Sequence, residues 1–329
     1  HPRDLEAARA LIRLEVEAEQ PREALRVARR VTDAVGAEDP ESVGELVRTS
    51  MELMARAGRW DLTAEAASLI PEGAPEGVRL QALRLEIEGL QRSERHRAAL
   101  ERLDSSDLEG PEVQAIRSDL LFEIGEEGRA RDLLQSLESS NPRLAARVYQ
   151  GQELYEEALP LWQTVVDQNP DSLQARFSLG AALERTGRFQ EATETFRALL
   201  GESPDFHLAL NYLGYMWAER GENLDEAQDL VERALELDPG NGAYVDSLGW
   251  IFYQKGEYEK ALRQLRRAAD LLPRDGTVQE HLGDALLALG NAEEARAAYQ
   301  RALELQDDEA PALEGKLKDA ERRERGGSP

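Results

Sequence analysis

The amino-acid sequence predicts an all-α protein built as a helical solenoid, and two observations carry that prediction. The composition is rich in Ala, Leu, Glu and Arg, which favour helices, and aromatic residues make up only 5% of the 329 residues. A Leu-Gly pair also recurs at a nearly constant interval in the second half of the chain. A fixed interval of this kind indicates that one structural unit is stacked repeatedly along an axis, so chain length does not set the number of globular domains.

The net charge and the missing residue types narrow the function. The formal net charge is −25, from 40 Lys and Arg against 65 Asp and Glu. Nucleic-acid binding depends on clustered cations, and anionic lipid surfaces repel acidic chains, so neither partner is expected. The chain has no cysteine, which excludes disulfides, thiolate metal sites and thiol nucleophiles. No stretch approaches the roughly 18 consecutive apolar residues of a membrane-spanning helix, so no transmembrane segment is expected.

Residues 1–138 are expected to form four irregular helix pairs. Turn signals divide this region at residues 58–60 (Gly-Arg-Trp) and 125–127 (Gly-Glu-Glu), and residues 72–75 (Glu-Gly-Ala-Pro) mark a break between two pairs. Each predicted pair has two short helices around a turn. The four segments are 5–38, 44–77, 79–110 and 111–138. Generic helical hairpins are the alternative interpretation to true repeats in this region.

The second half of the chain carries the repeat itself. The Leu-Gly pairs are spaced by 34, 35 and 34 residues, and they are Leu179-Gly180, Leu213-Gly214, Leu248-Gly249 and Leu282-Gly283. A glycine separates the two halves of each unit, at Gly187, Gly221, Gly256 and Gly290. A small residue follows at a fixed offset, at Ala192, Ala227, Ala261 and Ala295. Prolines close three of the units, at Pro204, Pro239 and Pro273.

One unit shows why this pattern predicts a pair of packed helices. Residues 242–255 place Val245, Leu248 and Phe252 at helical spacing, and the glycine at 256 ends that helix. Residues 257–271 again carry apolar residues at helical spacing, and Pro273 stops the second helix. A lone pair of helices cannot bury its apolar stripe, whereas stacked neighbours can, so the sequence predicts a solenoid.

These units resemble the tetratricopeptide repeat (TPR), whose 34-residue pattern combines Leu-Gly in its first helix with Ala and Pro in its second. The resemblance implies a right-handed superhelical solenoid of antiparallel helix pairs. It covers five tandem units, at 139–172, 173–206, 207–241, 242–275 and 276–309. The departures are Ala145-Ala146 in place of Leu-Gly, Leu199 in place of Ala, Asp307 in place of Pro, and one inserted residue within 222–224.

The resemblance also predicts the structure of the residues on either side of these five units. It implies that residues 1–138 are degenerate TPR-like units, and the strongly charged segment 310–325 is expected to form a capping helix. Residues 326–329 are expected to be a disordered tail. Residues 207–305 are similar to signal-peptide-bearing TPR proteins of Gram-negative bacteria, some of which are periplasmic or outer-membrane-associated scaffolds. That likeness implies a periplasmic or outer-membrane-associated location, with the cytoplasm as the alternative.

No enzyme signature is present, so no catalytic residue and no cofactor are expected. The sequence lacks the glycine-rich phosphate-binding loops, HExxH and GxSxG motifs. Its four histidines are not spaced as metal ligands, and His281 is expected to be a solvated side chain with Asp284 on the same helical face. Pairs of carboxylates are frequent because acids are abundant, and we interpret them as solvated faces rather than as acid–base pairs.

The TPR resemblance implies a partner-binding groove on the concave wall formed by the first helices. The residues at the positions that the family exposes there are Phe177, Asn211, Tyr215, Asp246, Trp250, Tyr253, Glu280 and Asp284. Two interpretations compete for the aromatic residues: they are packed between helices, or they are anchors for a bound peptide. We expect anchors for Trp250 and Tyr215. Trp217 and Trp162 fall at packing positions, and we expect them in the core.

Charge predicts the partner of this groove. The cationic clamp with which chaperone-binding TPR proteins hold a carboxylate is absent, so an acidic groove is expected to accept basic or neutral extended segments. The predicted function is therefore a non-catalytic protein-binding scaffold or adaptor that is monomeric or part of a hetero-complex. The alternative is a self-associating structural subunit of a bacterial envelope or secretion complex. The N-terminal half is expected to be a spacer or to carry a different, more polar interface.

Overall fold

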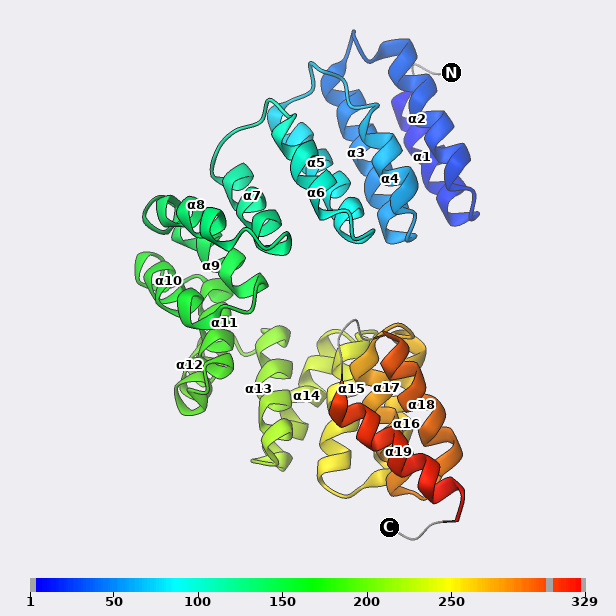
Figure 1. The fold of residues 1–329 in the computed structure, drawn as a ribbon, viewed down its shortest axis with the longest axis vertical. Helices are drawn as coiled ribbons and strands as arrows, with labels where there is room; N and C mark the ends of the chain where they lie inside the picture. The colour runs from blue at the N-terminus through cyan, green and yellow to red at the C-terminus, as the bar shows by residue number, and fades with distance from the viewer. Residues whose placement is uncertain (1–3, 306–309, 327–329) are drawn as a thin grey trace. The chain divides into compact units, whose positions relative to one another are not determined.

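The computed structural model describes residues 4–305 and 310–326, and in these residues every regular element is an α-helix. The chain divides into two compact units, residues 1–165 and 166–329, and the division falls inside α10. Figure 1 labels the nineteen helices of the described residues. In the first unit they are α1 (Leu5–Glu17), α2 (Pro21–Val35), α3 (Pro40–Arg56), α4 (Trp60–Ala67), α5 (Glu76–Gln91), α6 (His96–Asp104), α7 (Pro111–Glu123), α8 (Glu127–Ser140), α9 (Pro142–Gly151) and α10 (Tyr155–Gln168).

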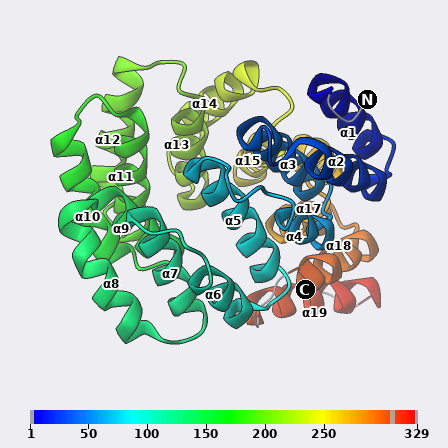
Figure 2. The same ribbon diagram turned by 90° about the horizontal axis from the view of Figure 1, so that it is seen from above.

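The second unit contains four helix pairs and a final single helix. Figure 2 shows α11 beside α12 and α13 beside α14. The helices are α11 (Leu173–Arg185), α12 (Phe189–Glu202), α13 (His207–Arg220), α14 (Leu224–Leu237), α15 (Gly242–Gln254), α16 (Tyr258–Leu271), α17 (Gly276–Ala288), α18 (Ala292–Leu305) and α19 (Pro311–Glu324). We call α11, α13, α15 and α17 the first helices and α12, α14, α16 and α18 the second helices.

Local sequence signals explain where the helices begin and end. Side chains cap several N-termini: Ser172 accepts a hydrogen bond from the Ala175 amide, and Asp275 accepts one from the Val278 amide. Between the two helices of a pair the chain turns through a residue with positive φ, for example Gly256 at +76°. A side chain would strain the backbone there, so glycine is the residue that lets the second helix fold back.

Close packing of each pair depends on the glycine of the Leu-Gly motif. A Cβ atom at Gly249 would lie 2.7 Å from Leu265 Cγ of the second helix. The same clash recurs in all four pairs of the second unit; the opposing side chains are Phe196 for Gly180, Val231 for Gly214, Leu265 for Gly249 and Tyr299 for Gly283. The small second-helix residues are fully buried, at Ala192, Ala227, Ala261 and Ala295. The two helices therefore approach more closely than any larger residue would allow.

The core contains the tryptophans that sequence spacing placed there. Trp162 and Trp217 are each only 2% exposed, so this prediction is confirmed. The indole of Trp162 donates a hydrogen bond to the Gln150 side chain at 2.9 Å, which satisfies its buried N–H. The inserted residue within 222–224 is accommodated by two left-handed residues, Gly221 and Asn223, before α14 starts.

The boundaries of the repeat units stay a prediction, although the helices can be placed within them. Each of the segments 173–206, 207–241, 242–275 and 276–309 contains one complete helix pair. Helix α19 lies within the segment expected to cap the stack. Leu313 and Ala320 of α19 are buried against α18, and most of its charged residues are exposed. Of the predicted tail, residues 327–329 lie outside the described residues, as does Asp307.

The substitution Gly214→Ala tests the steric constraint. A Cβ at this position would lie 2.6 Å from Val231 Cγ2 and 2.9 Å from the backbone oxygen of Ala227, which cannot rotate away. We expect this change to lower the free energy of unfolding by about 1–3 kcal/mol, despite the helix-propensity gain of alanine. Urea unfolding followed by circular dichroism measures it.

Gly201→Ala is the matched control. Gly201 lies near the end of α12, and no heavy atom lies within 4 Å of the position of an added Cβ. This change is expected to be neutral or to stabilise by up to about 1 kcal/mol. Equal effects of the two substitutions would show that the glycine is not selected by packing.

Candidate functional site

The candidate site is a cluster of aromatic rings and a histidine on three successive first helices. Tyr215 comes from α13, Trp250 and Tyr253 from α15, and His281 from α17. The ring centroids of Tyr215 and His281 lie 6.5 Å apart, and those of Trp250 and Tyr253 lie 4.8 Å apart. We call the surface that carries these four residues the first-helix face. Three of the predicted groove residues, Tyr215, Trp250 and Tyr253, thus lie in one cluster with His281.

Trp250 combines the two interpretations that the sequence left open. Its indole stacks on the imidazole of His281 at 4.1 Å, with 14° between the planes, and on Tyr253 with 6° between the planes. Even so, Trp250, Tyr253 and Tyr215 are only partly buried, so each keeps accessible surface. Packing holds these rings in place and leaves part of each one available for contact.

The remaining predicted aromatic residue belongs to a different group. Phe177 of α11 packs edge-on against Phe196, Phe206 and Tyr212, with centroid distances of 5.8, 5.9 and 5.4 Å. Phe177 therefore supports the junction between the pairs α11–α12 and α13–α14. No ring contact links it to Tyr215 or Trp250 among the described residues.

The expectation that His281 is solvated is wrong. His281 is 6% exposed, and its Nδ1 lies 3.0 Å from Oδ2 and 3.1 Å from Oδ1 of Asp246, which is 5% exposed. The two residues are 35 positions apart, which is one repeat, so the stacking of α17 on α15 brings them together. Sequence reasoning considered only partners on the histidine's own helix and therefore missed this pair.

The pair changes the protonation of His281. Burial alone would lower the pKa of this imidazole, but its hydrogen bond to Asp246 and the negative charges of Asp246, Glu219 and Asp284 outweigh burial. The pKa of His281 therefore lies above its ordinary value. In its protonated form the imidazole neutralises a buried carboxylate and offers a cation to the face of Trp250.

A lysine of α19 forms ion pairs with two acids of α17, the preceding first helix. The Nζ atom of Lys316 lies 2.7 Å from Glu280 Oε1 and 2.6 Å from Asp284 Oδ2. Burial would lower the pKa of Lys316, but its hydrogen bonds to the two carboxylates raise it above the usual value. Tyr299 also donates its hydroxyl to Asp284 at 2.8 Å. Lys316 follows Glu280 by 36 residues, close to one repeat, and this spacing was a signal that could have predicted the contact.

These contacts correct the exposure that the resemblance implied. Asp246 and Asp284 were expected on an open groove wall, but they are 5% and 7% exposed. Asp246 pairs with His281 of α17 and Asp284 with Lys316 of α19, because a carboxylate is buried at acceptable cost only when it is paired. The face is consequently less acidic than the sequence suggested. Glu219, which is exposed near Tyr215, and partly buried Glu280 contribute its remaining negative charge.

Two neutral polar side chains of this region have atoms that make no hydrogen bond within the described part of the chain. Asn211 of α13 is partly buried, and its Oδ1 has no hydrogen-bond partner within the described part of the chain. The same holds for Nε1 of Trp250. Burial and the charges of Glu219 and Asp246 raise the pKa of Tyr215, so its hydroxyl stays protonated at neutral pH. The first-helix face therefore has partly exposed rings, together with one acceptor and one donor that are buried and have no partner among the described residues.

Residues 4–305 and 310–326 contain no group of three or more His, Asp or Glu side chains arranged to hold a metal ion. Within the same residues, none of the helices combines the length and the apolar composition needed to span a bilayer.

Comparison with known proteins identifies the family to which the chain belongs. The family model of the tetratricopeptide repeat matches residues 143–205, 187–242 and 247–311, which together make up half of the chain. The chain therefore belongs to the tetratricopeptide repeat family, and its all-α architecture of stacked helix pairs agrees with that assignment.

The chain also resembles individual proteins, each over only part of its length. The TPR repeat-containing protein PA4667 of Pseudomonas aeruginosa is 29% identical over 163 residues, which are 47% of this chain and 28% of that protein. The human protein O-mannosyl-transferase TMTC1 is 31% identical over 161 residues, or 47% of this chain and 18% of that protein. The chain thus spans less than a third of either relative. The crystal structure of TTC0263, a TPR protein of Thermus thermophilus, covers 55% of this chain and 97% of its own, with a TM-score of 0.49 and 22% identity.

The raised pKa of His281 predicts a pH-dependent contribution to stability. A histidine whose folded pKa exceeds its unfolded value of about 6.5 stabilises fully below that pH, and the contribution is lost as the pH rises through the folded pKa. His281→Gln is therefore expected to cost more stability at pH 6 than at pH 9. Urea unfolding at constant ionic strength, followed by circular dichroism, measures the difference.

Asp246→Asn provides the control background. Without this carboxylate, the pH dependence of the His281→Gln effect is expected to shrink, because the main group that raises the pKa is gone. A His281→Gln effect of the same size at both pH values would contradict the charged pair.

Proposed function

We propose that the chain is a non-catalytic scaffold that binds a segment of a partner protein on its first-helix face. The observation that carries this proposal is the cluster of Tyr215, Trp250 and Tyr253, held in place by His281 but only partly buried. Tyr and Trp are the residue types enriched at the centres of protein interfaces. The repeat family supports the same role, because TPR folds typically bind proteins and do not catalyse reactions.

The face also suggests how a partner segment is held. An extended peptide exposes N–H and C=O groups along its length, which complement the unused Asn211 Oδ1 and Trp250 Nε1 once these side chains turn toward it. Glu219 and Glu280 favour a basic or neutral segment over an acidic one. Because Asp246 and Asp284 are already paired with His281 and Lys316, we expect the dependence of binding on salt to be modest.

The double substitution Tyr215→Ala/Trp250→Ala tests this function. Affinity capture from the native organism, with quantitative mass spectrometry, compares the wild type with this variant. We expect a partner that is enriched by the wild type and lost with the variant, with the affinity lowered by about 2 kcal/mol or more for Trp250→Ala alone. Circular dichroism must show that the variant is folded.

Trp60→Ala is the matched control, because Trp60 is also a partly buried tryptophan but lies at the start of α4 in the first unit. This variant should retain the partner. Partners retained equally by all variants would move the interface away from the first-helix face. If Trp250→Ala instead lowers the free energy of unfolding by about 3–5 kcal/mol, the residue serves packing.

The second candidate function is self-association as a structural subunit of a bacterial envelope or secretion assembly. Leu11 and Leu14 favour this function, since these apolar side chains of α1 are 42% and 60% exposed. Sedimentation analysis over a wide concentration range separates the two functions. A strict monomer at high concentration supports the scaffold, and a concentration-dependent oligomer supports assembly.

We further propose that the protein works in the periplasm or at the outer membrane of a Gram-negative bacterium. The support is the likeness of residues 207–305 to signal-peptide-bearing TPR proteins, and the cytoplasm is the alternative. Fractionation of native cells, followed by immunoblotting, is expected to find the protein in the envelope fractions. Recovery only with a cytoplasmic marker would contradict this location.

A further inference from the structure

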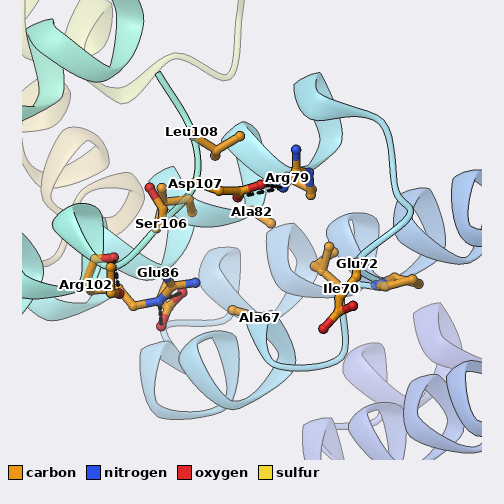
Figure 3. Close-up of a pocket in the computed structure, with 13 residues that line it drawn as sticks. Ala67, Ile70, Glu72, Arg79, Ala82, Glu86, Arg102, Ser106, Asp107 and Leu108 are labelled. Atoms are coloured by element: carbon orange, nitrogen blue, oxygen red, sulfur yellow. Dashed lines mark hydrogen bonds and ion pairs between the residues drawn. The ribbon is translucent and has the colours of Figure 1, made fainter. Parts of the chain in front are cut away.

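A crevice of about 590 Å³ lies in the first unit between the helix pairs α3–α4 and α5–α6. Figure 3 shows its lining: Ala67 and Ile70 lie on the α4 side, and Arg79, Glu86 and Arg102 on the α5–α6 side. The segment after α6 contributes further polar groups. Its volume falls within the range of typical ligand sites.

Short second helices create this crevice. Helix α4 has 8 residues and α6 has 9, whereas each second helix of the second unit has 14. The last residue of α4, Ala67, and the residue that caps the end of α6, Ser105, both line the space. The missing helical turns are replaced by linkers that do not fill the gap between the pairs. The crevice therefore arises where the chain departs from the regular repeat.

The guanidinium of Arg79 donates hydrogen bonds to Asp107 but keeps one N–H group without a partner among the described residues. Its Nη1 donates to both carboxylate oxygens of Asp107 at 2.7 Å. Its Nε is buried and has no hydrogen-bond partner among the described residues. A buried donor left unpaired destabilises the free protein, so an acceptor that enters the crevice and draws the guanidinium toward it gains this hydrogen bond.

Arg102 adds donors on the same wall. Its Nε donates to both oxygens of Glu86 at 2.9 Å, and its side chain is 39% exposed. Its two terminal nitrogens make no hydrogen bond within residues 4–305 and 310–326. Figure 3 shows the two ion pairs, Arg79–Asp107 and Arg102–Glu86, side by side along the crevice. Asp107 and Glu86 occupy only part of each guanidinium, so both arginines keep N–H groups that have no partner among the described residues.

The lining also includes apolar side chains beside its polar ones. Leu83 and Leu108 are 3% and 7% exposed, and Ile70 is partly buried opposite the arginines. An aliphatic side chain that lies against these residues buries further apolar surface. The crevice thus combines unused guanidinium donors with neighbouring apolar side chains, and a carboxylate beside an aliphatic group is the ligand chemistry that matches both.

We propose that this crevice is a second protein-binding site, which takes an extended partner segment with an Asp or Glu next to an aliphatic residue. It is separate from the first-helix face and has the opposite charge preference. The lining also carries Glu72, so its carboxylates outnumber its two arginines, and recognition relies on hydrogen-bond geometry rather than on net charge. A chain with both sites holds two chemically different partners at once.

A peptide array tests the proposal on the full chain. The probes are acetylated and amidated heptapeptides with a central Leu-Asp-Leu, in many flanking contexts, each paired with its Leu-Asn-Leu counterpart. We expect the best aspartate peptides to bind at least tenfold more tightly than their asparagine partners, measured by fluorescence anisotropy. The double variant Arg79→Gln/Arg102→Gln is expected to abolish this difference.

Further variants keep the test independent of folding. Ala67→Phe fills the crevice and leaves both ion pairs intact, so it should weaken the aspartate peptides at least tenfold. Arg26→Gln/Arg129→Gln removes two exposed, ion-paired arginines elsewhere in the first unit and should leave binding unchanged. The variant Tyr215→Ala/Trp250→Ala should also bind these peptides normally, which separates this site from the first-helix face.

Three results would overturn the proposal. The first is equal binding of the aspartate and asparagine series. The second is binding that survives both Ala67→Phe and the double arginine substitution. The third is complete competition by N-acetylaspartate at the concentration of the peptide, which would make the crevice a site for a small acid.

Discussion

The second unit depends on one steric constraint, the absence of a side chain where the first helix of each pair crosses the second. In all four pairs an added Cβ would lie 2.5–2.7 Å from the opposing side chain. Protein interiors are packed as densely as crystals of small molecules, so neighbouring side chains cannot absorb such an overlap and the two helices are forced apart. The fully buried alanines of the second helices belong to the same close packing within each pair.

This constraint also determines the chemistry of the first-helix face. Because pairs stack at a fixed interval, a residue on one first helix lies beside the residue about 35 positions later on the next. His281 meets Asp246 in this way, and Lys316 of α19 meets Glu280 and Asp284. Each of these acids is thereby part of the bonding between successive repeats. The partly exposed rings of Tyr215, Trp250 and Tyr253 are what the face retains for another molecule.

The site could be predicted in part. Family positions placed Tyr215, Trp250 and Tyr253 on one wall, and in the structure Tyr215 and Trp250 contact His281 while Tyr253 stacks on Trp250, because backbone register decides which residues share a helical face. They failed to predict the burial of Asp246 and Asp284, because burial depends on the side chain that the next helix contributes. Phe177 joined a different aromatic group for the same reason. The N-terminal crevice had only an indirect signal, the short and broken helix pattern around residues 72–75.

The sequence by itself determined the all-α class, the helix pairs of the second unit, the core positions of Trp162 and Trp217 and the family. These follow from local periodicity and from spacing along the chain, which are written directly in the residues. Only the tertiary structure decided which charges are neutralised, which rings stack on His281 and where a crevice opens between helix pairs. Such features arise from side chains that meet across long stretches of the chain, often a whole repeat. Their energies depend on distance and burial in the folded molecule, which a one-dimensional pattern does not encode.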